Sequence, residues 1–532
     1  MLAITTFLLF TGSVAVIAFL WTRKDDHHTA TGYFLAGRSL PWIVVAGSLL
    51  LTNLSTEQLV GINGGAYAHG MMLMAWEVFA AVAMIIMAAV FLPRYLRGGI
   101  ATVPQFLEQR YDKTTRRLTG FLFLLSLTIG FMPFVLYSGA VAMNGLFEIE
   151  AMLGVTRDTA IWLIVIAVGL VGGAYAVLGG LKAVAVSDTI NGAGLFIGGL
   201  MIPVLGLIAL GQGSFTDGIG VITTEHPERL NPIGGADSNI PWGTLITGML
   251  LVHLFYWCTN QAIVQRTFGA RSLAEGQKGL MFAAFMKLLG PLYLVLPGVI
   301  AWHLFQGDLP DQDQAYPALV REVLPTALVG FFGAVIFGAV LSSFNSALNS
   351  ASTVFSLDIY RGLLRPDASD RDVVRAGRIC GCILVAIAIL VAPTIRYAPD
   401  GLFDLMKQIT AFFEIPLLTV IVVGFFTKHV SALAAKVGLL VGMGNAALLN
   451  LVLDRTFFGV ELHWLYVAFI NFVLMVIVML VVGRLSPRTT PYVPQTTNEV
   501  DLTPWRGLVP ASVLVLIGVA GIYILFTWLG VR

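Results

Sequence analysis

Apolar runs long enough to cross a membrane recur along the whole chain. A bilayer core takes about 20 residues in a helix, and fourteen runs of this kind can be marked, at 2–21, 41–68, 71–93, 117–145, 158–178, 183–212, 241–265, 277–304, 326–360, 376–394, 401–427, 431–453, 462–483 and 507–529. Several exceed 25 residues, which predicts tilted or broken helices. We therefore expect an all-α membrane protein with fourteen transmembrane helices, surrounded by a lipid bilayer.

The composition supports this interpretation. Charged residues make up 11% of the 532 residues, whereas an ordinary soluble domain has about 25%. The mean hydropathy is +0.85. The net charge of +1, with no basic or acidic tail, argues against a nucleic acid partner. The three cysteines lie in or beside apolar stretches and fit neither a disulfide framework nor a zinc site.

Positive residues predict the orientation. With the N-terminus outside, 23 of the 31 lysines and arginines fall in inside loops. The first run has its positive residues after it, so we expect a retained helix instead of a signal peptide. The chain is predicted to lie in the cell (inner) membrane as a multi-pass protein, with both termini outside.

The runs leave no space for a soluble domain. We expect one transmembrane transporter domain over 1–532, with a core at about 41–427, a leading helix at 2–21 and trailing helices at 431–529. Short helices are expected in the long outside loops 213–240 and 305–325. The chain has no Gly-rich phosphate loop, and its eight histidines do not cluster at ligand spacing. We therefore expect neither an ATP-driven pump nor an enzyme.

Two polar clusters interrupt apolar runs. The segment Thr52–Gln58 lies within the second run and cannot face lipid as a plain helix. A broken helix whose freed carbonyls line a cavity would solve this, and such oxygens suit Na⁺. The alternative is a polar face packed on neighbouring helices. The segment Leu341–Ser346 offers adjacent hydroxyls, although single serines are often only contacts between helices.

A third cluster, His253–Gln261, lies in the seventh run and mixes aromatic rings with hydrogen-bonding groups. This combination suits a sugar, although an aromatic belt at the membrane interface is the alternative. The breaks in the second and seventh runs are five spans apart, which predicts inverted repeats of five helices. Single charges within runs are further candidates, and Asp404 and Lys407 are close enough in sequence to pair.

Several motifs together carry a family resemblance. They are Gly32–Arg38, Tyr175–Leu181, Gln265–Arg266, Gly279–Lys287 and Asn349–Tyr360. On these residues the chain resembles the sodium/solute symporter family, and within it the sodium/glucose (galactose) cotransporter branch. The resemblance implies a LeuT-like core of five plus five helices in an inverted repeat, with one extra helix before it and three after.

The resemblance also implies a sodium site. Its ligands would be the carbonyls of Leu51, Leu54 and Ala339 and the hydroxyls of Ser342 and Ser343. A possible second sodium site or exit path would use Asp188 and Ser346. Asn345 stands where two-sodium members have Ser or Thr, which favours one sodium ion per cycle.

A sugar pocket is implied in the same way. Its residues would be Gln58, Glu77, Ala80, His253, Tyr256, Trp257, Lys287 and Lys407, with Tyr256 as the inner gate. Ala80, His253 and Lys407 depart from the galactose pattern, which has Ser, Asn and Gln there. The extra cation, Lys407, either pairs with Asp404 or Glu77 or binds an anionic sugar.

The function expected from these features is sodium-coupled import of a sugar by alternating access. The sugar would be a hexose or a related compound, possibly anionic. The alternative is another small solute on the same fold, such as inositol, a monocarboxylate, an amino acid or a nucleoside.

Overall fold

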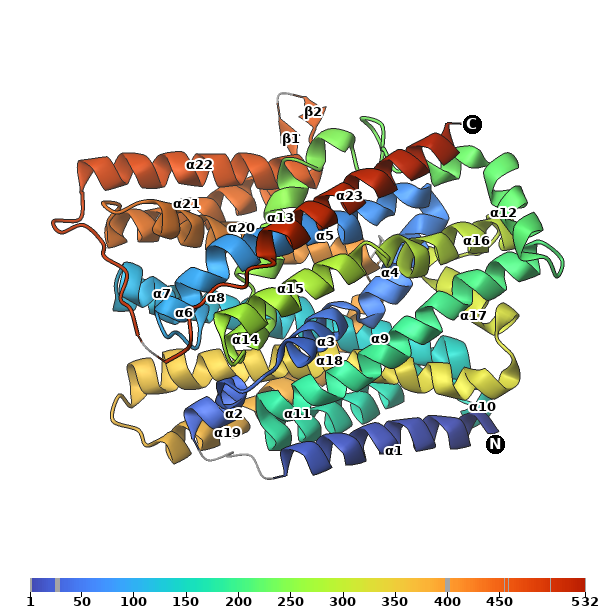
Figure 1. The fold of residues 1–532 in the computed structure, drawn as a ribbon, viewed down its shortest axis with the longest axis horizontal. Helices are drawn as coiled ribbons and strands as arrows, with labels where there is room; N and C mark the ends of the chain where they lie inside the picture. Colours follow the sequence, from blue (N-terminus) through green and yellow to red (C-terminus); the bar gives the residue numbers. More distant parts are fainter. Residues whose placement is uncertain are drawn as a thin grey trace.

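A bundle of helices that share one approximate direction makes up almost the whole molecule (Figure 1). The computed structural model describes residues 2–23, 29–397, 402–453, 455–457, 459–497 and 499–531. Among these residues, 11 helices are long and apolar enough to cross a membrane, or 13 when each of two bent pairs is one span. The prediction of a multi-pass helical protein is confirmed. The predicted number of fourteen spans is not confirmed. One reason is the break after Asn53, which leaves before it a 12-residue helix that is too short to count as a span.

The helices up to the middle of the chain are α1 (Leu2–Thr22), α2 (Ala30–Leu35), α3 (Trp42–Asn53), α4 (Thr56–His69), α5 (Ala75–Ile86), α6 (Leu92–Arg97), α7 (Val103–Arg110), α8 (Lys113–Leu125), α9 (Met132–Phe147), α10 (Ile149–Leu153) and α11 (Arg157–Leu210). The next are α12 (Phe215–Thr224), α13 (Gly248–Cys258), α14 (Gln261–Phe268), α15 (Leu273–Lys287), α16 (Leu296–Phe305), α17 (Ala315–Val323), α18 (Thr326–Val354), α19 (Asp370–Val391) and α20 (Leu402–Phe426). The last are α21 (Ala432–Ala447), α22 (Trp464–Leu485) and α23 (Leu508–Gly530), with a small hairpin of β1 (Thr456–Phe457) and β2 (Val460–Glu461) before α22.

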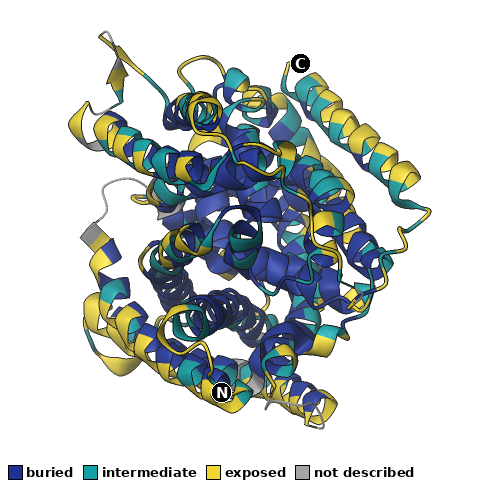
Figure 2. Ribbon diagram, turned by 90° about the vertical axis from the view of Figure 1, so that its left-hand side faces the viewer, coloured by how far each residue is buried: buried dark blue, intermediate teal, exposed yellow. Residues whose placement is uncertain are grey.

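Burial is concentrated at the centre of the bundle. Seen end-on, buried residues fill the middle while exposed residues lie on the outer helix faces (Figure 2). The peripheral helix α23 illustrates the outer surface, since Ile517 and Ile524 are 63% and 69% exposed and the helix carries no charged side chain. Lipid is the solvent that such a surface requires. α1 begins and α23 ends at the same end of the bundle, as the predicted topology requires (Figure 1).

Both predicted helix breaks are present. The second run divides into α3 and α4 around Leu54 and Ser55, and the seventh divides into α13 and α14, which are bent by 45°. A third bend, of 47°, separates α15 from the helical segment that begins at Pro291. Proline lacks an amide hydrogen and disrupts the preceding turn, which explains this bend. The two long loops contain α12 and α17, as expected.

Gly180 joins two spans within α11. Its backbone angles are φ 63° and ψ −171°, a conformation that is essentially restricted to glycine. A Cβ atom at this position would lie 2.9 Å from the carbonyl oxygen of Tyr33, whose neighbour Phe34 is fully buried. Gly180 therefore lets the chain turn between two spans while α2 packs against the turn.

We expect Gly180→Ala to destabilise the protein by about 1–3 kcal/mol because of backbone strain, with the close contact adding to it. Gly154→Ala is the matched control, since Gly154 has φ 63° and ψ 32° and open space around it. The control should cost about 1 kcal/mol. Thermal unfolding of the detergent-solubilised variants measures both, and equal midpoints would contradict the role given to Gly180.

Candidate functional site

The interruption between α3 and α4 changes the partners of the backbone amides. In a continuous helix the amide of Ser55 would donate to Leu51 and that of Gln58 to Leu54. Here Ser55 donates to the carbonyl of Asn53 at 3.0 Å, and Gln58 donates to the carbonyl of Ser55 at 3.1 Å. The carbonyls of Leu51 and Leu54 are thereby released from these helical bonds. Both residues are buried.

The serine pair of α18 lies against this break. The Ser343 hydroxyl donates to the carbonyl of Thr52 at 3.0 Å, across 291 positions of the chain. Ser342 and Ala339 are buried on the same helix. The structure therefore brings the two predicted clusters together at the break. Carbonyl and hydroxyl oxygens are hard ligands, so this set of donors fits an alkali cation.

A further polar chain runs beside the break. The Asp188 carboxylate of α11 accepts hydrogen bonds from Ser48 at 2.8 Å and from Thr52 at 3.5 Å. The Thr52 hydroxyl also lies 3.0 Å from that of Ser346. Asp188 and Ser346, the two candidates for a second sodium site or exit path, are thus connected through Thr52.

Two arginines, which were among those counted to the inside loops, are buried. Arg266 has no exposed surface and donates from α14 to the Ser346 hydroxyl, and its charge acts on Asp188. Arg110 is equally buried and donates to the carbonyls of Gly424, Thr427 and Val430. Both residues lie on short helices, α7 and α14, and not in loops. Arg266 is a functional candidate that the loop assignment missed.

A buried ion pair lies on the other side of the break. The Lys287 ammonium of α15 is 2.6 Å from the Glu77 carboxylate of α5, and both side chains have no exposed surface. Lys287 also donates to the side chain of Asn53, the last residue of α3. Glu77 and Lys287 are therefore brought together as predicted, while the role of Asn53 was missed.

Aromatic rings surround the two lysines. The Lys287 ammonium lies 5.6 Å from the ring centroid of Trp257, and the Lys407 ammonium of α20 lies 5.4 Å from those of both Trp76 and Tyr256. The Trp76 ring is 5.7 Å from that of His253 in an edge arrangement. These contacts gather His253, Tyr256, Trp257 and Lys407 around the Glu77–Lys287 pair.

Other predicted residues are less directly connected. Gln58 is buried on α4, and Ala80 is buried one helical turn after Glu77 on α5. The side chain of Asp404 lies outside the described residues, so its pairing with Lys407 stays a prediction. Glu414, which the sequence did not single out, is buried on α20. Like Glu77 it is an acid within an apolar run, although its run also contains Asp404 and Lys407.

The family model for the sodium:solute symporter family matches residues 33–442. This chain belongs to the sodium:solute symporter family. The relatives of this symporter include the uncharacterized symporter YidK of Escherichia coli (strain K12), 52% identical over 98% of this chain and 90% of that protein. A sodium/glucose cotransporter of Vibrio parahaemolyticus is 32% identical over 81% of this chain and 82% of that protein. The sodium/myo-inositol cotransporter 2 of Homo sapiens is 31% identical over 82% of this chain and 67% of that protein.

Solved structures show the fold. A Na⁺-coupled sialic acid symporter in a substrate-bound outward-open state has a TM-score of 0.77 at 19% identity, covering 92% of this chain and 98% of that one. Mhp1, a nucleobase-cation-symport-1 family transporter, has a TM-score of 0.55 at 13% identity, covering 87% of this chain and 96% of that one. The fold of this symporter is therefore LeuT-like. Its relatives are transporters and not enzymes, and sodium is the coupling ion.

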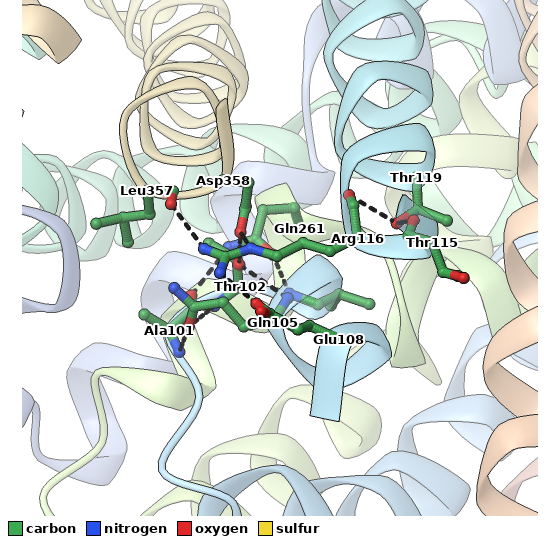
Figure 3. Close-up of polar contacts among 11 residues, drawn as sticks. Ala101, Thr102, Gln105, Glu108, Thr115, Arg116, Thr119, Gln261, Leu357 and Asp358 are labelled. Carbon is green, nitrogen blue, oxygen red and sulfur yellow. Dashed lines mark hydrogen bonds and ion pairs between the residues drawn. The ribbon is translucent and has the colours of Figure 1, made fainter. Parts of the chain in front are cut away.

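A separate polar network ties helix ends of this symporter together (Figure 3). Arg116 of α8 contacts Asp358 at 2.7 Å and Glu108 at 2.5 Å. Asp358 also accepts from the Thr102 hydroxyl at 3.0 Å. Gln261, the first residue of α14, accepts from the amide of Val103 at 3.0 Å. The network thus joins α7, α8, α14 and the end of the helix that continues α18.

Replacing Asp358 tests this network. Asp358→Asn removes a fully buried carboxylate and leaves Arg116 with one charged partner, so we expect a loss of about 2–3 kcal/mol of stability. Glu108→Gln is the control, because Glu108 is 26% exposed and should contribute less than about 1 kcal/mol. Thermal unfolding separates the two, and a larger effect of the control would contradict the assignment.

The Glu77–Lys287 pair gives a second stability prediction. Glu77→Gln leaves the ammonium without its carboxylate in a buried place and should cost about 3–5 kcal/mol. The double variant Glu77→Gln/Lys287→Met removes both charges and should recover most of that loss. Thermal unfolding of the single and double variants provides the measurement. A double variant as unstable as the single one would show that the charge pairing is not the cause.

Proposed function

We propose that this symporter imports a sugar or related polyol with sodium by alternating access, acting as one transporter domain over residues 1–532. The observation that carries the proposal is the pair of neighbouring residues at the end of α3. The carbonyl of Thr52 contacts Ser343 of α18, while the side chain of Asn53 contacts Lys287 of α15. Ion and solute ligands would therefore be adjacent on one broken helix, which is a recurrent arrangement in transporters.

For the sodium ion, the proposed ligands are the carbonyls of Leu51, Leu54 and Ala339 and the hydroxyls of Ser342 and Ser343. The released carbonyls at the break and the contact of Ser343 with Thr52 support this set. One ion per cycle is proposed, because Asn345 supplies an amide where a second site would need a hydroxyl. Asp188 and Ser346 are proposed to lie on the exit path.

For the solute, the proposed contacts are Gln58, Glu77, Ala80, His253, Tyr256, Trp257, Lys287 and Lys407. Carboxylate and amide oxygens can accept from solute hydroxyls, ammonium and amide N–H groups can donate to them, and aromatic faces can stack on C–H faces. The relative described as a sodium/glucose cotransporter supports a sugar. The relative described as a sodium/myo-inositol cotransporter favours inositol as the second candidate.

One sodium ion is energetically sufficient. Moving one charge through about 100 mV yields about 2.3 kcal/mol. A tenfold sodium gradient adds about 1.4 kcal/mol. The total of about 3.7 kcal/mol supports a solute ratio of several hundredfold. We propose that the symporter lies in the cell (inner) membrane with both termini outside, as the positions of the lysines and arginines favour.

The proposal is tested by uptake into proteoliposomes. Radiolabelled glucose, galactose and myo-inositol should accumulate when sodium is present outside, and not with potassium in its place. Ser343→Ala should raise the sodium concentration for half-maximal uptake at least tenfold, because it removes a proposed ligand. Ser352→Ala is the control, since Ser352 is a buried serine about two and a half helical turns further along α18, on the opposite face from Ser343. Absence of sodium-dependent uptake of all three compounds would overturn the sugar assignment.

A further inference from the structure

Five buried ionisable side chains lie in or beside the proposed solute pocket. They come from four helices and are Glu57 of α4, Glu77 of α5, Lys287 of α15, and Lys407 and Glu414 of α20. None of them is more than 8% exposed. Among these described side chains, carboxylates outnumber ammonium groups by three to two. The fully ionised set therefore carries an excess negative charge before any solute enters.

Each ammonium group has a distinct set of partners. Lys287 is held by Glu77 and Asn53. Lys407 lies instead over the rings of Trp76 and Tyr256, each with its centroid 5.4 Å away. Aromatic faces attract cations and fix the position of the ammonium. Aromatic rings thus contribute to the placement of Lys407.

The charge of Lys407 is compensated from several sides. Glu414, Glu57 and Glu77 all attract it, with Glu414 the strongest. The seven-residue spacing of Lys407 and Glu414 places both on one face of α20. Lys287, His253 and the phenol of Tyr256 also lie close to Lys407 among the described residues. The two lysines are thus outnumbered by the three carboxylates, so the pocket offers an anionic solute no net positive charge.

The acceptor atoms of the pocket support the same conclusion. One oxygen of each of Glu57, Glu77 and Glu414, and the amide oxygen of Gln58, is buried without a hydrogen-bond partner among the described residues. Such atoms need donors, because an unsatisfied buried acceptor is unfavourable. Solute hydroxyls supply donors, whereas a carboxylate or sulfonate group supplies further acceptors.

We propose that Glu414 is a specificity-determining positioning residue that neutralises Lys407, and that the symporter therefore takes an uncharged polyhydroxylated solute and rejects anionic sugars. This inference rests on the proposed function and deepens it. It argues against the second role that the sequence left open for Lys407, the binding of an anionic sugar. Glu414 acts through Lys407 and need not contact the solute.

The experiment compares uptake of solutes that differ in charge. Purified full-length protein in proteoliposomes is given radiolabelled galactose, galacturonate or galactosamine under a sodium gradient, with the glucose series in parallel. The wild type should transport the neutral sugar at least tenfold faster than the uronate or the amino sugar. Thermal stabilisation by the same compounds gives a second readout that needs no variant.

Two variants test the role of Glu414. Glu414→Gln leaves Lys407 with less compensation and should raise the ratio of uronate to neutral sugar uptake about tenfold. Glu414→Gln/Lys407→Gln should restore the wild-type ratio, because both charges are gone. Glu461→Gln is the matched control at the exposed hairpin, where the side chain is 72% exposed, and should leave the ratio unchanged.

The outcomes separate the two proposals. If the wild type prefers the uronate or the amino sugar with sodium, the proposed function stands and this inference fails. The inference also fails if Glu414→Gln folds and transports without changing the ratio. If no compound of either series is transported or stabilises the protein, with or without sodium, the sugar assignment fails and the inference fails with it.

Discussion

The interruption between α3 and α4 is the constraint on which the site depends. Backbone groups at membrane depth have no water to bind, so a break is tolerated only where protein groups satisfy it. The amides of Ser55 and Gln58 donate hydrogen bonds to nearby carbonyls, and the hydroxyl of Ser343 donates to the carbonyl of Thr52. The break therefore requires α18 at its side. It also requires that its polar residues face the interior of the bundle, which the burial of Thr52 through Gln58 satisfies.

The same break links the two halves of the proposed site through the covalent chain. Thr52 faces α18 and Asn53 faces Lys287. Because the two residues are adjacent, a shift of one backbone position moves the other. Lys287 is fixed in turn by Glu77 of α5, so a change at the break reaches three helices through direct contacts. A rigid, continuous helix at this place would give no such connection.

The breaks were predictable from sequence because clustered polar residues in an apolar run have few acceptable structures. The contacts they make were not predictable, since their partners lie far along the chain: Asn53 and Lys287 are 234 positions apart, and Arg116 and Asp358 are 242 apart. Arg266 follows the seventh run, where a loop was expected, whereas the structure places it in α14 with its side chain buried. Glu414 carried a usable signal, but its role follows only from the convergence of α4, α5 and α20 on Lys407.

An uncharged solute limits how the two cargoes can be coupled. A sodium ion would attract an anionic solute directly, and that attraction alone would make their binding cooperative. For a neutral solute this attraction is absent, so the coupling must pass through the protein. The shortest path is the break, because an ion that orders the carbonyls of Leu51 and Leu54 also fixes Asn53 and thereby Lys287. By linkage, a solute held at Lys287 orders the ion ligands to the same degree.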